Sequence, residues 1–118
     1  MRFEDMEIWK RSARLSADLY KSFRDCKDFG FKDQITRSAL SIPSNIAEGA
    51  ERDFKKEFVR FLKYAKGSCG ELRTQIYIGI DVGYIEPAQG KIWINETREI
   101  SAMLVGFINS IQKLITEN

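Results

Sequence analysis

The chain has 118 residues, 43% hydrophobic and 31% charged, a balance typical of a globular protein and unlike that of a disordered or membrane-spanning one. Nineteen lysines and arginines face seventeen aspartates and glutamates, and the net charge of +2 is too small to indicate a polyanionic partner by itself. The chain contains no histidine, which removes the commonest general base and metal ligand and argues against most hydrolase and metalloenzyme mechanisms.

The length predicts one domain over residues 1–118. Cys26 and Cys69 do not form a CxxC pair, so neither a metal knuckle nor a redox pair is indicated. The N-terminal residues MRFEDMEIWKRS lack the apolar core of a signal peptide, and no window resembles a membrane-spanning helix. We therefore expect a reduced, cytoplasmic protein that has no membrane association and needs no cofactor.

The first two helices are predicted over about residues 5–24 and 31–49. In the first, Ile8, Leu15 and Leu19 form an apolar stripe, and Asp5 is the expected N-cap. Trp9, Ala13 and Tyr20 add a second apolar flank, which predicts a second buried surface. Pro43 lies within the second helix, so this helix either kinks near Ala39 or breaks there, and the continuing periodicity favours a kink.

The third and fourth helices are predicted over about residues 54–83 and 87–117. The third is expected to begin after the N-cap Asp53, and its apolar stripe starts at Phe54. Its central small residues, including Gly67 and Gly70, predict the close approach of another helix. The fourth helix is expected to begin at Pro87, to fray at Gly90 and to bury residues at heptad-like steps as far as Leu114. A strand over IYIGIDVGYI is the less favoured alternative, because these residues continue the helical stripe.

Four helices with short connectors predict an all-α fold, an antiparallel up-down-up-down four-helix bundle. Because the first and third helices carry apolar or small residues beyond one internal stripe, we also expect the bundle to form a homo-oligomer.

Three features of the sequence are candidates for a chemical site. Ser41, Ser44, Asn45 and Glu48 surround Pro43. We interpret them as structural polar contacts, within or between subunits, that could satisfy the carbonyl freed by the proline or reach a neighbouring helix. Cys69 continues the core stripe and has no histidine to activate it, so we expect a buried structural thiol. The segment KGSCGE lacks the order of a phosphate-binding loop. The sequence therefore predicts no catalytic residue, no metal site and no enzyme.

Basic residues suggest a different function. They recur along the third helix and, in smaller number, along the first, where few acids intervene. Such a row is typical of a surface that neutralises phosphates, although a solvated helix face has the same pattern. The candidate nucleic-acid-binding residues are Lys10, Arg11, Arg14, Lys55, Lys56, Arg60, Lys63 and Lys66.

Three segments resemble the bacterial four helix bundle proteins first described as products of intervening sequences within 23S ribosomal RNA genes. These are RSALSIPSNIAEG from Arg37, EFVRFLKYAKGSCGELRTQIYIGIDVGYI from Glu57 and DMEIWKRSARLSADLY from Asp5, which together cover nearly the whole chain. The positions that match the first motif are Ser41, Ile42, Pro43, Asn45, Ile46, Ala47, Glu48 and Gly49, and those that match the second are Gly67, Ser68, Glu71 and Leu72. They are motifs of packing and not of catalysis.

The resemblance implies a homo-oligomer, typically a pentamer, from a family in which most members have no demonstrated enzymatic activity. Relatives include accessory proteins of diversity-generating retroelements, which associate with a reverse transcriptase and nucleic acid. We therefore expect a non-enzymatic helical-bundle accessory protein that contacts RNA, DNA or a protein partner such as a reverse transcriptase. The alternative is a protein-protein scaffold with no nucleic-acid contact.

Overall fold

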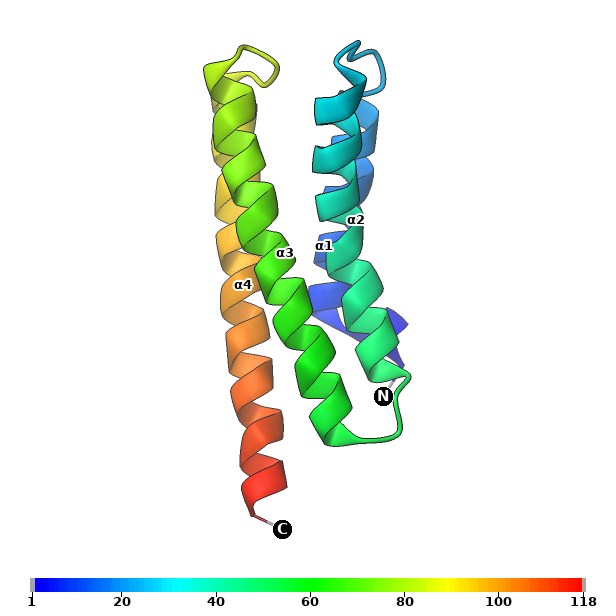
Figure 1. Cartoon of the computed structure of the whole chain (residues 1–118). Coiled ribbons are helices and arrows are strands. Elements are labelled where there is room, and N and C mark those ends of the chain that lie inside the picture. The colour runs from blue at the N-terminus through cyan, green and yellow to red at the C-terminus, as the bar shows by residue number, and fades with distance from the viewer. Residues whose placement is uncertain (1, 118) are drawn as a thin grey trace.

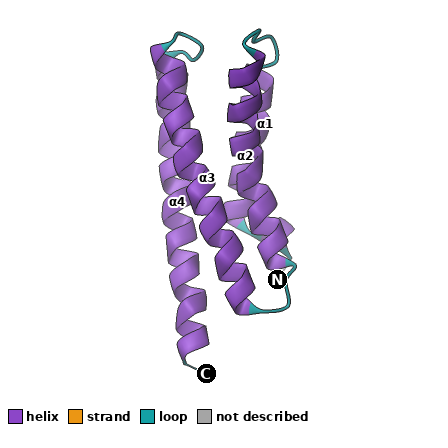
Figure 2. Ribbon diagram, viewed as in Figure 1, coloured by secondary structure: helices purple, strands orange, loops and turns teal. Residues whose placement is uncertain are grey.

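The computed structural model describes residues 2–117, which form four α-helices preceded by a short 3-10 turn. The elements are η1 (Phe3–Asp5), α1 (Glu7–Ser22), α2 (Phe29–Ala50), α3 (Lys55–Asp81) and α4 (Pro87–Thr116). Consecutive helices run in opposite directions and are joined at alternate ends of the molecule (Figure 1). Within residues 2–117 there is no strand, and helices and loops account for the whole ribbon (Figure 2). The predicted all-α four-helix bundle is confirmed.

Each helix packs against two others. The contacting pairs are α1 with α2, α2 with α3, α3 with α4, and α4 with α1, so α1 and α3 lie diagonally across the bundle. The bundle measures 51 × 21 × 20 Å. Helix α1 has 16 residues and α4 has 30, and the C-terminal end of α4 extends past the start of α1 (Figure 1). No helix within residues 2–117 is long and apolar enough to cross a membrane.

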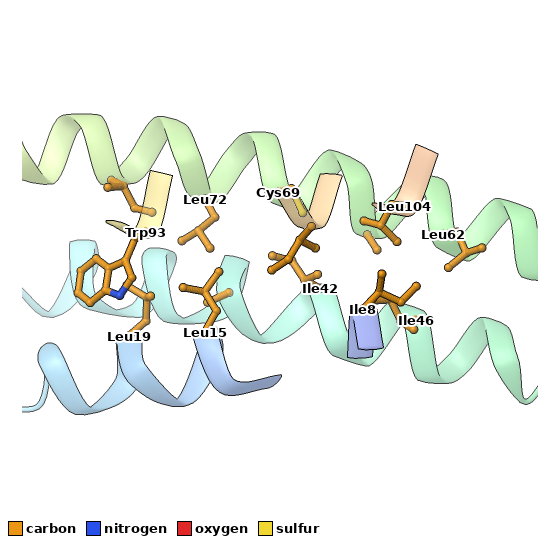
Figure 3. Close-up of a cluster of buried hydrophobic side chains, with 14 of the residues drawn as sticks. Ile8, Leu15, Leu19, Ile42, Ile46, Leu62, Cys69, Leu72, Trp93 and Leu104 are labelled. Atoms are coloured by element: carbon orange, nitrogen blue, oxygen red, sulfur yellow. The ribbon is translucent and has the colours of Figure 1, made fainter. Parts of the chain in front are cut away.

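The core consists of the apolar stripes of the four helices, brought together along the bundle axis. Figure 3 shows side chains from all four helices meeting there, among them Leu19, Ile42, Leu72 and Leu104, each fully buried. Burial of such side chains is the main force that holds the helices together. Two stripe predictions were wrong. Phe54 is 72% exposed because it precedes the first turn of α3, and Leu114 is 49% exposed near the free end of α4.

Helix starts differ from the predicted ones. Asp28 caps α2 by accepting a hydrogen bond from the backbone N–H of Phe31 at 3.1 Å, so this helix begins at Phe29. The predicted caps Asp5 and Asp53 were wrong, because Met6 and Phe54 occupy the N-cap positions of α1 and α3 without side-chain hydrogen bonds. Asp5 belongs instead to the preceding 3-10 turn.

The two loops at the upper end of the bundle in Figure 1 are tied together. The Tyr84 hydroxyl donates a hydrogen bond to the Asp28 carboxylate at 2.8 Å and so joins the α3–α4 loop to the start of α2. The Phe31 backbone N–H and this hydroxyl both lower the pKa of Asp28, and the same bond raises the pKa of Tyr84. The loop reverses at Gly83, whose φ of +84° lies in the left-handed region that glycine adopts without strain.

Helices α2 and α4 are continuous at Pro43 and Gly90, the two residues expected to disturb them. Helix α2 continues without a break through Pro43, so the proline does not divide it. Gly90 is buried in α4, where its backbone N–H bonds to the Glu86 carbonyl at 2.8 Å and Ile80 packs against it. Gly90 is therefore a packing position, and the predicted fraying there was wrong.

Candidate nucleic-acid interface

Exposed lysines follow the outer side of α3. Lys55, Lys56, Lys63 and Lys66 are all exposed, and within residues 2–117 none of them forms an ion pair or a side-chain hydrogen bond. Their charges are therefore available to a partner molecule. The steps along the helix place Lys56, Lys63 and Lys66 on one side, which faces α4.

Two hollows lie between α3 and α4 along these lysines. The first, of about 500 Å³, is lined by Lys63, Lys66 and Gly67 from α3 and by Val105, Ile108, Asn109 and Gln112 from α4. The second, of about 360 Å³, is lined by Lys56, Val59, Gln112, Ile115 and Thr116. Gln112 lines both, so they form one surface, which we call the lysine groove.

The lysine groove has the chemistry of an anion-binding surface. Its polar groups are the ammonium groups of Lys56, Lys63 and Lys66, the side-chain amides of Asn109 and Gln112 and the hydroxyl of Thr116. No carboxylate is among its described lining residues. Ammonium and amide N–H groups donate to phosphate oxygens. Gly67 leaves the groove open, because a Cβ placed on it would meet no atom within 4 Å.

Arg60, the remaining basic candidate on α3, is held by its own helix. Its Nε donates to the Glu57 carboxylate at 2.9 Å, and its guanidinium carbon lies 5.1 Å from the centre of the Phe61 ring. The bond to Glu57 raises the pKa of Arg60. Arg60 therefore remains charged, but a phosphate would have to compete with Glu57 for it.

The basic residues of α1 lie apart from this surface, because α1 and α3 are diagonal in the bundle. Lys10 and Arg14 are exposed, and Lys10 lies 3.9 Å from Glu7. Arg11 is bound within the bundle, since its guanidinium donates to Glu96 on α4 and lies 3.2 Å from Glu99. These carboxylates raise the pKa of Arg11. The sequence could not show this pairing, because Glu96 lies 85 residues away along the chain.

The residues around Pro43 form local contacts. The Asn45 amide donates to the Ser41 carbonyl at 2.8 Å, and the Ser41 hydroxyl donates to the Ser38 carbonyl at 2.7 Å. Neither bond reaches the carbonyl of Ala39. That carbonyl lacks its usual helical donor, because the proline at position 43 has no backbone N–H. These side chains therefore do not satisfy the Ala39 carbonyl, which was one of the two roles expected for them. Pro43, Ile42 and Ile46 are buried, Ala47 is half-buried, and Glu48 pairs with Arg52 at 2.9 Å.

The motif that begins at Arg37 and the motif that begins at Glu57 meet where α2 packs against α3. Gly49 lies so close to α3 that a Cβ on it would be 2.8 Å from the Phe61 Cβ. The hydroxyl of Ser38 donates to the Glu71 carboxylate, and Leu72 is fully buried. Ser68, by contrast, bonds only to the Tyr64 carbonyl of its own helix. No atom of the described chain lies within 4 Å of a Cβ placed on Gly67 or Gly70, so the predicted close approach of another helix is not found within residues 2–117.

Cys69 has the properties of a core residue. It is fully buried, as predicted, and burial raises its pKa to about 12 despite the opposing charge of Arg73. A thiol with this pKa carries almost no thiolate at neutral pH, so it is a poor nucleophile. Within residues 2–117 no group of three or more Cys, Asp or Glu side chains is arranged to hold a metal ion.

The predicted second apolar flank of α1 lines a hollow. This apolar groove, of about 440 Å³, lies between α1 and α2. Its α1 side includes Trp9, Ala13, Ala17 and Tyr20, and Leu40 on its α2 side is 46% exposed. The groove is completed by Phe3, Ser16, Pro43, Ser44 and Ala47. An exposed concentration of apolar side chains is typical of a protein-protein contact.

Sequence reasoning missed the α4 side of the lysine groove. Asn109 and Gln112 are three residues apart and lie off the buried stripe of α4, a spacing that places both amides on one side of the helix. That signal was present in the sequence. Only the fold, however, could show that these amides lie opposite the lysines of α3.

Comparisons with known proteins agree with the fold. A family model described as 23S rRNA-intervening sequence protein matches residues 4–106. A crystal structure from Bacteroides thetaiotaomicron, described as a protein of unknown function from the S23 ribosomal protein family, is similar with a TM-score of 0.80 and 26% sequence identity. The similarity covers 86% of this chain and 97% of that one. No curated protein matches the chain.

Proposed function

The chain belongs to the family of 23S rRNA-intervening sequence proteins, and from this premise we propose that it is a non-enzymatic, homo-oligomeric accessory protein that binds RNA or DNA. The observation that carries the proposal is the lysine groove, where Lys56, Lys63 and Lys66 form no ion pair with residues 2–117 and face the amides of α4. Such a surface contacts phosphates without reading bases, so binding is expected to be strong at low salt and weakly sequence-specific.

Oligomerisation strengthens this mode of binding. A closed ring repeats the lysine groove on every subunit, and a long nucleic acid that contacts several grooves gains affinity through effective concentration. The apolar groove between α1 and α2 supports assembly, because it lies on another pair of helices and can be buried while the lysine groove stays accessible. The ring size that we propose, a pentamer, rests on the family resemblance.

The test is the salt dependence of binding to a structured RNA and to duplex DNA, followed by fluorescence anisotropy. Log affinity should fall linearly with log salt between about 50 and 200 mM. The triple variant Lys56→Gln, Lys63→Gln, Lys66→Gln should lower the magnitude of the slope by about two to three, because each phosphate contact contributes roughly 0.7 to 0.9.

A matched control distinguishes the contribution of the lysine groove to binding from the contribution of net charge. Lys21, Lys27 and Lys91 are exposed and lie outside the lysine groove, so their combined replacement by Gln makes the same change in charge. This control should keep most of the wild-type affinity. An equal loss in both triple variants would show non-specific attraction, and absence of binding at low salt would contradict the proposal.

The second candidate function is a protein-protein scaffold without nucleic-acid contact. It is favoured by large exposed aromatic side chains at the two ends of the bundle, Phe29 and Phe54, which are 71% and 72% exposed. Binding of a protein partner through them would persist at high salt and fail in a Phe29→Ser, Phe54→Ser variant. Binding through the lysine groove would show the opposite pattern in a pull-down at low and high salt.

A further inference from the structure

A polar hollow lies between α2 and α3, on a different side of the bundle from the lysine groove. It has a volume of about 480 Å³ and is lined by Gln34, Arg37, Ser38, Ser41, Glu71 and Gln75. We call it the acceptor groove, after the Glu71 carboxylate and the Gln75 side-chain carbonyl among its lining residues.

One buried acceptor in this groove has no partner. The Oε1 atom of Gln75 is shielded from solvent, and it is the single buried side-chain N or O atom without a hydrogen bond among the described residues. A buried polar atom without a partner destabilises the folded state, so such atoms are rare and need an explanation. A donor supplied from outside the chain would remove that destabilisation.

The carboxylate of Glu71, which lines the same groove as Gln75, is also not neutralised. Glu71 accepts a hydrogen bond from the Ser38 hydroxyl, which holds one of its oxygens in the groove, but within the described residues it forms no ion pair. Arg37 lines the same groove, yet its Nε donates to Asp33 on its own helix at 3.0 Å. Within the described residues, the groove therefore presents a negative charge that no ion pair neutralises and a buried carbonyl oxygen that no donor reaches.

We propose that the acceptor groove binds a guanidinium group. A guanidinium carries five N–H donors in a planar fork, so it can pair with the Glu71 carboxylate and also donate to Gln75 Oε1. It is more weakly hydrated than an ammonium, which suits a partly buried site. A metal ion fits less well, since the groove holds one carboxylate and the described residues contain no cluster of metal ligands.

Two sources can supply this group, a small arginine-containing ligand or an arginine side chain of a second copy of the chain. The site goes beyond the proposed nucleic-acid function, because it attracts a cation where the lysine groove attracts an anion. Failure of one proposal therefore leaves the other untouched, since different residues and probes test them.

The first arm of the test is a titration with N-acetyl-arginine amide, followed by NMR through the side-chain amide signal of Gln75. The probe should shift this signal, and N-acetyl-citrulline amide, which has the same shape without the charge, should not. Glu71→Gln should weaken binding about tenfold, because it removes the charge and keeps the shape. Asp81→Asn, an equal charge change at the exposed end of the same helix, should leave binding unchanged.

The second arm measures assembly of the same variants by analytical ultracentrifugation. If a second copy supplies the guanidinium, free arginine amide does not bind, and Glu71→Gln raises the dissociation constant of the oligomer about tenfold relative to Asp81→Asn. Either result supports the proposal and identifies the source. Citrulline binding as tight as arginine binding would overturn it. The proposal would also be overturned if the wild-type protein did not bind the probe and its oligomer had the same dissociation constant as that of Glu71→Gln.

Discussion

At the scale of single residues, two glycines of the bundle have opposite surroundings. A Cβ on Gly49 would lie 2.8 Å from the Phe61 Cβ and 3.2 Å from the Phe58 carbonyl oxygen, whereas a Cβ on Gly67 would meet nothing within 4 Å. Both lie within helices, where alanine is favoured over glycine by about 1 kcal/mol. Gly49→Ala should nevertheless destabilise the fold by about 1 kcal/mol or more, because overpacking outweighs that gain. Gly67→Ala should stabilise it by about 0.5–1 kcal/mol.

Urea unfolding followed by circular dichroism, at one protein concentration for all variants, measures both changes. The opposite signs are the decisive result, since helix propensity alone would stabilise both variants. If Gly67→Ala instead destabilised the assembled protein, another molecule would pack against the position, and the loss would grow with protein concentration.

The raised pKa of Cys69 predicts how the stability of the fold and the reactivity of this thiol depend on pH. Burial raises its pKa from 9.0 to about 12, so the folded state favours the neutral thiol. A group whose pKa is raised on folding contributes stability below its unfolded pKa, and that contribution declines as the pH rises above about 9. At pH 8 the folded protein should therefore label at Cys69 roughly 1000-fold more slowly than the unfolded protein, from thiolate fraction alone.

The measurement is the rate of reaction with a thiol reagent in a Cys26→Ser variant, which leaves Cys69 as the single thiol. The same variant in urea supplies the unfolded rate. Fast labelling of the folded protein would show an accessible thiolate and would revive a nucleophilic role.

At the scale of helices, the bond between Arg11 and Glu96 joins α1 to α4. The two side chains are 32% and 27% exposed, and the Arg11 Nε donates to Glu96 at 3.0 Å. A charge-assisted bond in a partly buried place is stronger than a surface ion pair. Arg11→Met should therefore destabilise the fold by about 1–2 kcal/mol, with most of the loss recovered as coupling in a double-mutant cycle with Glu96→Gln.

The matched control is the ion pair of Arg37 with Asp33, four residues apart on α2 and 75% and 62% exposed. Its removal should change the free energy of unfolding by less than about 0.5 kcal/mol. Equal effects in the two pairs would mean that Arg11 acts through its surface charge and does not hold α1 against α4.

The helices themselves could be predicted because their buried residues repeat at three- and four-residue steps. Ile35, Ala39, Ile42 and Ile46 follow this rule in α2, and each is fully buried. Helix ends were harder to place. Asp28 and Asp53 are equally good caps by residue type, yet only Asp28 caps a helix, since the hydrogen bond depends on a backbone geometry that sequence does not specify.

The candidate nucleic-acid interface could be predicted from the sequence only for each helix separately. The recurrence of basic residues along α3 predicted a basic surface on that helix, but it did not show that Lys56, Lys63 and Lys66 border α4. Likewise, the charge of Arg11 was visible in the sequence and its partner Glu96 was not. Contacts between distant segments depend on how the helices pack, and periodicity within one helix carries no information about that.

At the scale of the whole molecule, three surfaces of different chemistry lie between three pairs of helices. The apolar groove lies between α1 and α2, the acceptor groove between α2 and α3, and the lysine groove between α3 and α4. Because a four-helix bundle has a separate furrow between each neighbouring pair, one surface can be buried by assembly while the others remain open. This arrangement is suited to a subunit that binds its own copies and a charged partner at once.

Assembly through the apolar groove is the last prediction. Wild-type protein at micromolar concentration should have a mass of several times 13.7 kDa by light scattering, about five times if the ring is a pentamer. Leu40→Glu should shift the mass towards the monomer, because it places a charge in an apolar contact. Ile92→Glu, at an exposed apolar position of α4 outside this groove, should leave the mass unchanged. A 13.7 kDa wild-type monomer would rule out the oligomer, and dissociation by Ile92→Glu alone would move its interface to α4.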